Sequence, residues 1–230
     1  MGMTGRQRVA VLASGGGSNL QALLDHLAVL GDRRAADVAL VVAGRETAGA
    51  LARARRAEVK TAVATPESLA GLLDAHAIDI VVLAGYLAFV PAAVTERWAG
   101  RIVNVHPALL PSFGGHGLYG LRVHRAVLDA GARVSGATVH FVDAEYDRGP
   151  IIAQWPVPVA DGDTPETLAA RVLRIEHLLL PRAVDALARG AVSLTDGRVR
   201  GGVAAPTTAF SLRLPDDASL VADIDALFPA

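Results

Sequence analysis

The sequence contains no cysteine, which excludes disulfide bonds and thiolate metal sites. It also lacks an excess of charge of one sign, because 22 Lys and Arg residues balance 23 Asp and Glu residues for a formal net charge of −1. This balance argues against a nucleic-acid-binding protein with a broad basic surface. No apolar run approaches the ~20 residues of a membrane span, and the first residues lack the pattern of a signal peptide. We therefore expect a cytoplasmic protein without nucleic-acid or membrane partners.

The 230 residues are enough for one large domain with a full core. In the first half, short runs rich in Val, Ile and Leu alternate with segments of helical periodicity. Strands are expected at residues 8–14, 38–44, 59–64, 79–86 and 101–105. Helices are expected at residues 18–30, from 47, at 65–76 and from about 91. Continuously apolar strands that alternate with helices predict an α/β, Rossmann-like fold with a mostly parallel central sheet covered on both faces.

The pattern changes after His106. A glycine-rich loop is followed by a helix that Gly131 ends, and then by two strands, at 135–143 and 150–159, with no helix between them. These two strands predict an antiparallel or mixed C-terminal portion of the sheet. A long helix with a Thr-Pro-Glu start follows and is expected to be disturbed near Pro181. Periodicity is weaker from Ala191 onward.

The segment ASGGGSNL, at residues 13–20, joins the first strand to the first helix. Its glycines leave backbone N–H groups unobstructed, and the helix N-terminus adds its dipole, so the segment predicts an anion site. It does not match G-x-G-x-x-G, because Leu20 stands at the last glycine position, and it has no Gly-Lys-Ser/Thr. A single phosphomonoester is therefore the favoured ligand. A tight turn with Ser18 as the N-cap is an equally good interpretation.

The strand RIVNVH becomes polar as it ends. Asn104 and His106 are two residues apart, so both side chains point to the same face, at the carboxyl end of the strand. Both can donate a hydrogen bond to a developing oxyanion, and His106 can also move a proton. A structural hydrogen-bonding role is the alternative, and the isolated N-x-H pattern favours it. Metal binding is not expected, because no second ligand stands at a suitable spacing.

Two further polar residues lie in the segment GATVHFVDAEYDRGPII. His140 falls on an alternating strand, and Asp147 lies in the loop before Gly149-Pro150. A carboxylate close to His106 would orient the imidazole and favour its charged form. Asp147 could instead be a turn residue, and His140 an ordinary half-buried strand residue. The spacing alone does not bring these groups together.

Four segments, in order, resemble the phosphoribosylglycinamide formyltransferase family of folate-dependent purine-pathway enzymes. They are SGGGSNLQAL, VVLAGYLAFV, RIVNVHPALLPSF and GATVHFVDAEYDRGPIIAQ. The resemblance covers roughly residues 7 to 190. It implies a formyltransferase domain at 1–190 and a C-terminal extension at 191–230 that packs on or trails the same domain. Another formyl-folate transferase, or formyltetrahydrofolate deformylase, is the alternative.

The resemblance implies a catalytic trio of Asn104, His106 and Asp147. The amine of glycinamide ribonucleotide would attack the formyl carbon of the co-substrate 10-formyltetrahydrofolate. Asn104 and His106 would hold the oxygen of the tetrahedral intermediate. Asp147 would keep His106 protonated and help to move the amine proton. His140 would support the trio, and no metal is needed.

The resemblance also implies binding residues. The substrate would contact Glu176 through its ribose hydroxyls and the loop residues Gly16, Gly17, Ser18 and Asn19 through its phosphate. The folate would contact Asn104 and Asp147 together with Leu87, Ala88, Phe89, Val90, Val142 and Ala144. A cis bond before Pro111 would help to fix the loop after His106. Ala88, Ala144 and Leu173 depart from the residues usual in the family. The resemblance leaves both a monomer and a homodimer open.

Overall fold

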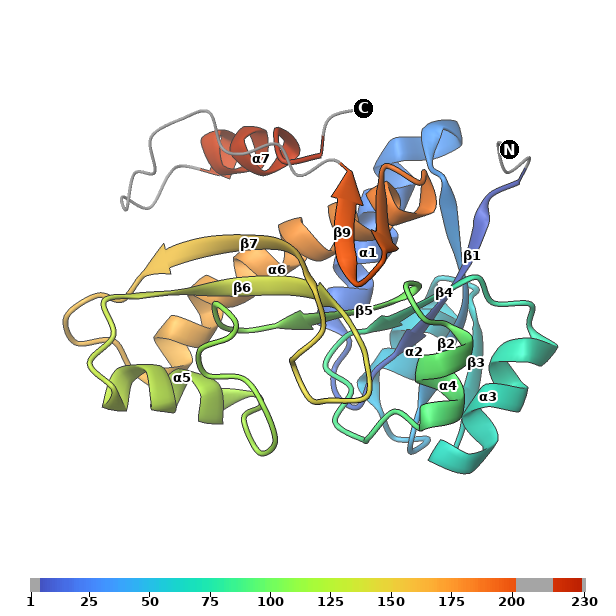
Figure 1. Ribbon diagram of the computed structural model, residues 1–230, viewed down its shortest axis with the longest axis horizontal. Coiled ribbons are helices and arrows are strands. Elements are labelled where there is room, and N and C mark those ends of the chain that lie inside the picture. The colour runs from blue at the N-terminus through green and yellow to red at the C-terminus, as the bar shows by residue number, and fades with distance from the viewer. Residues whose placement is uncertain (1–4, 202–216, 229–230) are drawn as a thin grey trace.

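The computed structural model describes residues 5–201 and 217–228 and is built on one seven-stranded sheet (Figure 1). The strand order is β3-β2-β1-β4-β5-β6-β7. The parallel strands are β1 (Gln7–Leu12), β2 (Ala36–Ala43), β3 (Lys60–Val63), β4 (Ile80–Leu83) and β5 (Ile102–His106). The antiparallel strands are β6 (Val134–Phe141) and β7 (Ile151–Pro158). The mostly parallel sheet with an antiparallel C-terminal portion is thus confirmed.

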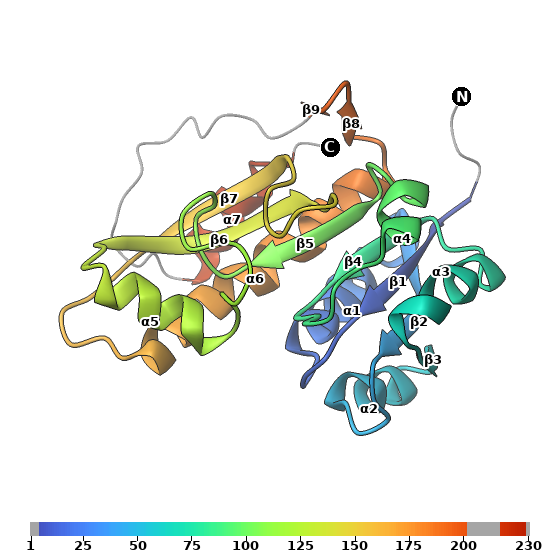
Figure 2. The ribbon, with the colours of Figure 1, turned by 60° about the horizontal axis from the view of Figure 1, so that its bottom comes forward.

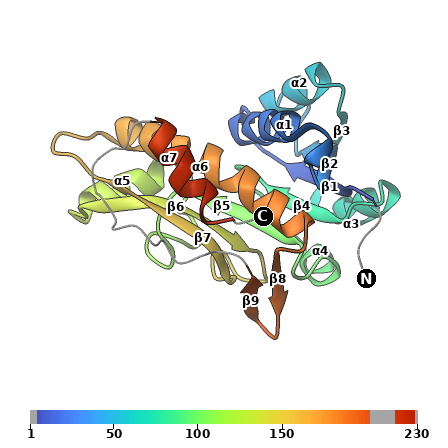
Figure 3. The ribbon, with the colours of Figure 1, turned by 90° about the horizontal axis from the view of Figure 1, so that it is seen from above.

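Helices cover both faces of this sheet (Figure 3). One side carries α1 (Ser18–Leu30), α2 (Gly49–Arg56) and α6 (Pro165–Ala188), and the other carries α3 (Pro66–Ala75) and α4 (Ala92–Arg97). A short 3-10 helix, Gly31–Arg33, follows α1, and α5 (Leu121–Asp129) packs against α6. Each face of the sheet has its own apolar core, as continuously apolar parallel strands require.

The strand order reverses between β1 and β4, because the chain first adds β2 and β3 outward and then returns to the other side of β1. Figure 2 shows β3 at one edge of the sheet and β7 at the other. In open α/β sheets such a reversal leaves a crevice at the carboxyl ends of the strands. The loops that follow β1, β4 and β5 therefore converge on one end of the sheet.

Local signals account for several helix ends. Thr65 and Thr164 each form a capping box with a proline in the first turn, as their Thr-Pro-Glu sequences predict. Gly131 follows α5 at a φ of 67° and ends it. The alternative interpretation, a turn with Ser18 as the N-cap, is wrong in its capping residue. Gly17 holds that position with a left-handed φ of 76°, and no side chain caps the helix.

Several expected element boundaries differ from the structure by a few residues, and the expected disturbance at Pro181 does not occur. The strand expected at 79–86 ends at Leu83, because Gly85 turns the chain away at a φ of 70°. The helix expected from residue 47 begins at Gly49. The long helix α6 continues past Pro181 to Ala188 without interruption. Its buried face, which includes Leu179, Leu180 and Val184, packs into the core on both sides of the proline and holds the helix together.

The C-terminal segment adds a hairpin and a helix. Strands β8 (Val192–Thr195) and β9 (Arg198–Gly201) pair around Asp196-Gly197, whose positive φ angles suit a two-residue hairpin turn. Helix α7 (Asp217–Asp225) packs against α6 through the buried side chains of Leu220 and Ile224. Residues 202–216 and 229–230 of the expected extension lie outside the described residues, and the division at residue 190 stays a prediction. Within the described ranges, no helix has the length and apolarity needed to cross a bilayer.

Candidate active site

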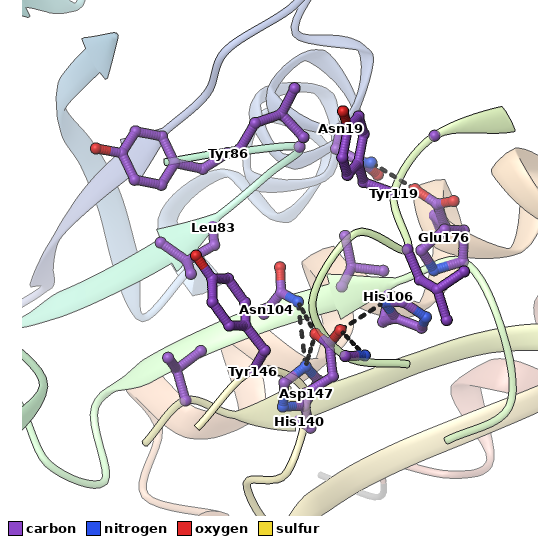
Figure 4. Close-up of a pocket in the computed structure, with 18 of the residues that line it drawn as sticks. Asn19, Leu83, Tyr86, Asn104, His106, Tyr119, His140, Tyr146, Asp147 and Glu176 are labelled. Atoms are coloured by element: carbon purple, nitrogen blue, oxygen red, sulfur yellow. Dashed lines mark hydrogen bonds and ion pairs between the residues drawn. The ribbon is translucent and has the colours of Figure 1, made fainter. Parts of the chain in front are cut away.

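A cavity of about 440 Å³ opens at the carboxyl ends of β4 and β5 (Figure 4). Its walls come from the β4–α4 loop, the glycine-rich loop before α5, the β6–β7 loop and the middle of α6. The predicted trio of Asn104, His106 and Asp147 lines this cavity. Residues from widely separated parts of the chain therefore meet in one cavity.

Strand β5 presents its two polar side chains to this cavity because the strand alternates. Val103 and Val105 pack into the core on one face, so Asn104 and His106 point to the other. The sheet register then places His140 of β6 directly opposite Asn104. The side-chain amide nitrogen Nδ2 of Asn104 lies 3.1 Å from Nε2 of His140.

His140 is held in one neutral tautomer. Its Nδ1 lies 2.7 Å from the Phe141 carbonyl oxygen, which can only accept, so Nδ1 carries the proton. Nε2 therefore accepts from Asn104, which turns the amide nitrogen of Asn104 toward His140 and Asp147 and its oxygen away from them (Figure 4). Burial lowers the pKa of His140, which keeps the imidazole neutral near pH 7.

Asp147 connects the other members of the site. Its backbone adopts a left-handed φ of 54°, which is uncommon for a residue other than glycine. Oδ1 lies 3.5 Å from Nδ2 of Asn104, and Oδ2 accepts a 2.9 Å hydrogen bond from the N–H of Gly115. A Cβ on the nearby Gly149 would lie 1.9 Å from the Phe141 carbonyl oxygen, so the loop closes this tightly only with glycine there.

The two ring nitrogens of His106 have different partners. Nε2 donates to the Phe113 carbonyl oxygen at 2.9 Å, and Nδ1 lies 3.5 Å from Oδ2 of Asp147. Burial lowers the pKa of His106, although the charge of Asp147 and the Phe113 carbonyl partly oppose this. This net direction differs from the protonated imidazole that the resemblance implied. When His106 is neutral its proton is on Nε2, so Nδ1 of His106 and Oδ2 of Asp147 both face each other as acceptors. A proton placed between these two atoms would be shared by both, which suits the pair to take up and release one proton.

The loop after His106 is fixed by buried hydrogen bonds. The Leu110–Pro111 peptide bond is cis, as the resemblance led us to expect. The hydroxyl of Thr138 donates to the Ala108 carbonyl oxygen at 2.6 Å and accepts from the Leu110 N–H at 3.0 Å. Gln154 donates to the Leu110 carbonyl oxygen at 2.8 Å. These bonds fix the loop that leads to the Phe113 carbonyl.

The far end of the cavity joins α1 to α6. Nδ2 of Asn19 donates to Oε2 of Glu176 at 2.7 Å, although the two residues are 157 positions apart in the sequence. Burial raises the pKa of Glu176, and the hydrogen bond from Asn19 partly opposes this. The remaining predicted phosphate-loop residues, Gly16, Gly17 and Ser18, directly precede Asn19 but do not line the cavity.

The wall expected to receive the folate is apolar. Leu87, Ala88, Phe89 and Val90 all line the cavity, as does Val142, whereas Ala144 does not. The ring of Tyr146 lies 5.5 Å from that of Phe89 and 5.7 Å from that of His116, measured between centroids. Sequence reasoning missed Tyr146 and Tyr119, which also line the cavity. The signal for both is an aromatic residue in a loop next to a polar motif.

A third buried histidine lies beside the trio. His124 of α5 lines the cavity, and its Nδ1 makes no hydrogen bond to any described residue. Burial, together with the nearby His106, lowers the pKa of His124 to about 4. The ring is therefore neutral at pH 7. Within residues 5–201 and 217–228, no three His, Cys, Asp or Glu side chains are arranged to hold a metal ion.

Comparison with known proteins agrees with this geometry. Residues 7–184 match the formyl transferase family. The chain is 42% identical over 193 residues to "Phosphoribosylglycinamide formyltransferase, chloroplastic" of Arabidopsis thaliana. The aligned region covers 79% of this chain and 65% of the plant protein. The protein of the same name from Vigna unguiculata is 42% identical over 192 residues, 79% of this chain and 61% of that protein.

A solved structure shows the same fold. Glycinamide ribonucleotide transformylase 1 from Symbiobacterium toebii has a TM-score of 0.78 and 40% identity, with 86% of this chain and 95% of that one covered. The chain spans less than two thirds of the length of either plant relative. The family expected from the sequence motifs is nevertheless confirmed, because the match extends over most of the chain. The chain belongs to the formyl transferase family.

Proposed function

We propose that this protein transfers the formyl group of 10-formyltetrahydrofolate to the amine of glycinamide ribonucleotide in purine biosynthesis. The observation that carries this proposal is the convergence of Asn104, His106 and Asp147 in one cavity whose far end holds the Asn19–Glu176 pair. One end of the cavity is suited to the substrate ribose, and the apolar wall is suited to a folate. The names of the plant and bacterial relatives support the same reaction.

The substrate would lie between α1 and α6. Gly16, Gly17, Ser18 and Asn19 stand at the start of α1, where unpaired N–H groups and the helix dipole favour a phosphate. Glu176 lies at hydrogen-bonding distance from Asn19 and would accept from the ribose hydroxyls. The amine would then extend toward Asp147, which lines the same cavity.

The folate would enter from the opposite side. Leu87, Ala88, Phe89 and Val90 would pack against its rings, and the loop with Val142 and Asp147 would receive the pterin. Ala144, in the same loop, does not line the cavity. His140 and Pro111 would act indirectly, by orienting Asn104 and by fixing the loop after His106.

The reaction needs neither a covalent enzyme intermediate nor an oxidant. The amine nitrogen attacks the formyl carbon, the bond from that carbon to N10 of the folate breaks, and one amine proton is passed to N10. His140 engages one N–H of the Asn104 amide, and the contact to Asp147 is long at 3.5 Å, so the second N–H is available to donate to the oxygen of the tetrahedral intermediate. His106 and Asp147 can carry the proton between amine and leaving group. One preorganised donor to such an oxygen typically contributes about 2.7–4 kcal/mol.

A spectroscopic assay with glycinamide ribonucleotide and 10-formyltetrahydrofolate tests the proposal. We expect formylated product and free tetrahydrofolate in equal amounts, with no folate consumed when the amine substrate is left out. Hydrolysis of the folate at the same rate with and without the amine would contradict the proposal and favour a deformylase.

A further inference from the structure

The cavity contains no side-chain cation. Among the described residues that line it, none is a lysine or an arginine, whereas Asp143, Glu145, Asp147 and Glu176 all contribute carboxyl groups. Leu173, on the α6 wall, is apolar. A phosphomonoester carries close to two negative charges near neutral pH. The proposed phosphate subsite therefore has the loop N–H groups and the dipole of α1 as positive partners, and a full positive charge would come from a side chain outside the cavity wall.

The loop that would bind the phosphate is held from behind by α2. The backbone N–H of Ala50 donates to the Gly15 carbonyl oxygen at 3.1 Å, and Nε of Arg53 donates to the Gly16 carbonyl oxygen at 2.7 Å. In a trans peptide the C=O and the following N–H point in opposite directions. Two carbonyls that point toward α2 therefore direct the N–H groups of Gly16 and Gly17 away from it.

This arrangement leaves no room between the loop and α2. A Cβ on Gly17 would lie 2.7 Å from Cα of Ala50, and a Cβ on Gly49 would lie 3.1 Å from Cα of Gly16. The guanidinium of Arg53 also reaches α1, where Nη1 lies 3.4 Å from Oε1 of Gln21. Arg53 thus connects α2, the loop and the first turn of α1.

We propose that Arg53 is the positioning residue of the phosphate subsite. Arg53 holds the loop N–H groups toward the ligand and supplies positive charge from behind the loop. This inference rests on the proposed function, because it assumes that the loop binds the phosphate of the substrate. Arg53 need not touch the ligand. It acts through its hydrogen bond to the Gly16 carbonyl and through its charge. The side chain is half-buried, so solvent screens that charge less than at a fully exposed position. Burial lowers the pKa of His177 on α6, and the charge of Arg53 lowers it further.

Arg53→Gln and Arg53→Lys test this role by calorimetry with ribose 5-phosphate and with glycinamide ribonucleotide. We expect Arg53→Gln to weaken both ligands by at least tenfold and to raise the KM for the ribonucleotide, with kcat within about threefold of wild type. Arg53→Lys keeps the charge and should recover most of the affinity. Binding of ribose, which lacks the phosphate, should be equally weak in all three proteins.

Arg56→Gln is the matched control, because Arg56 is an exposed arginine on the same helix. It should leave the affinity for both phosphate ligands unchanged. Unchanged affinity in Arg53→Gln would overturn the inference, as would a wild-type protein that does not bind ribose 5-phosphate. Binding that depends on Arg53 without any formyl transfer would instead support the inference and contradict the proposed function.

Discussion

Asn104 donates its side-chain amide to Nε2 of His140, the residue directly opposite on the neighbouring antiparallel strand. The Phe141 carbonyl fixes the tautomer of His140, and His140 in turn fixes the orientation of the amide. An asparagine amide can rotate, so the acceptor decides which of its groups faces Asp147. The orientation of the Asn104 amide, which we propose as the catalytic donor, is therefore set by His140, a residue that need not touch the substrate.

Replacing His140 tests this relationship. His140→Leu removes the acceptor, and we expect kcat to fall about tenfold, the equivalent of one hydrogen bond. His140→Gln can still accept from Asn104 and should recover part of the loss. The KM for the ribonucleotide should stay unchanged in both variants, because the Asn19–Glu176 end of the cavity is remote from the substitution. Equal activity of His140→Leu and wild type would mean that the amide is oriented by other groups.

Removing the proposed oxyanion donor, Asn104, or the proposed proton carrier, His106, should cost more. Asn104→Ala and His106→Ala are each expected to lower kcat by about 10²-fold or more. Steady-state kinetics measures the loss, and circular dichroism with thermal unfolding checks that each variant folds. Near-normal rates in folded variants would return the two residues to a structural role.

The charge of Asp147 should be visible at His106. Because Asp147 raises the pKa of His106 against the stronger effect of burial, Asp147→Asn should lower that pKa further. An NMR titration of the His106 ring measures the change, and kcat should fall in the same variant. A pKa for His106 that is unchanged or higher in Asp147→Asn would show that the 3.5 Å contact between the two side chains has no electrostatic effect.

His124 should make stability depend on pH. Its pKa is about 4 in the folded protein against 6.5 for the unfolded chain, so between these values the unfolded state binds a proton that the folded state does not. This contribution to stability is fully present above pH 6.5 and is lost as the pH falls toward 4. The slope contributed by this one group is at most about 1.4 kcal/mol per pH unit.

Urea unfolding of the wild type and of His124→Phe at several pH values measures this contribution. The phenylalanine ring fills similar space and does not titrate, so the variant should lose stability less steeply between pH 6.5 and 4. His106 and His140 stay in both proteins, and the difference between the two curves isolates His124. Parallel curves would show that His124 accepts a proton in the fold as readily as in the unfolded chain.

The sequence by itself determined the α/β class, the division of the sheet into parallel and antiparallel portions, and the polar ends of its strands. These features follow from local periodicity and from capping residues such as Thr65 and Thr164, which act within a few positions of themselves. Family motifs also identified Asn104, His106 and Asp147 as candidates, but their spacing gave no distances.

Only the tertiary structure decided how these residues are used. The register of β5 against β6 pairs Asn104 with His140, and the fold of the β6–β7 loop brings Asp147 to both. Packing of α2 behind the glycine-rich loop places Arg53 on the Gly16 carbonyl. Each of these contacts joins segments whose mutual position depends on the whole sheet and its cores. Local sequence patterns carry no information about such distances, because they are set by long-range packing.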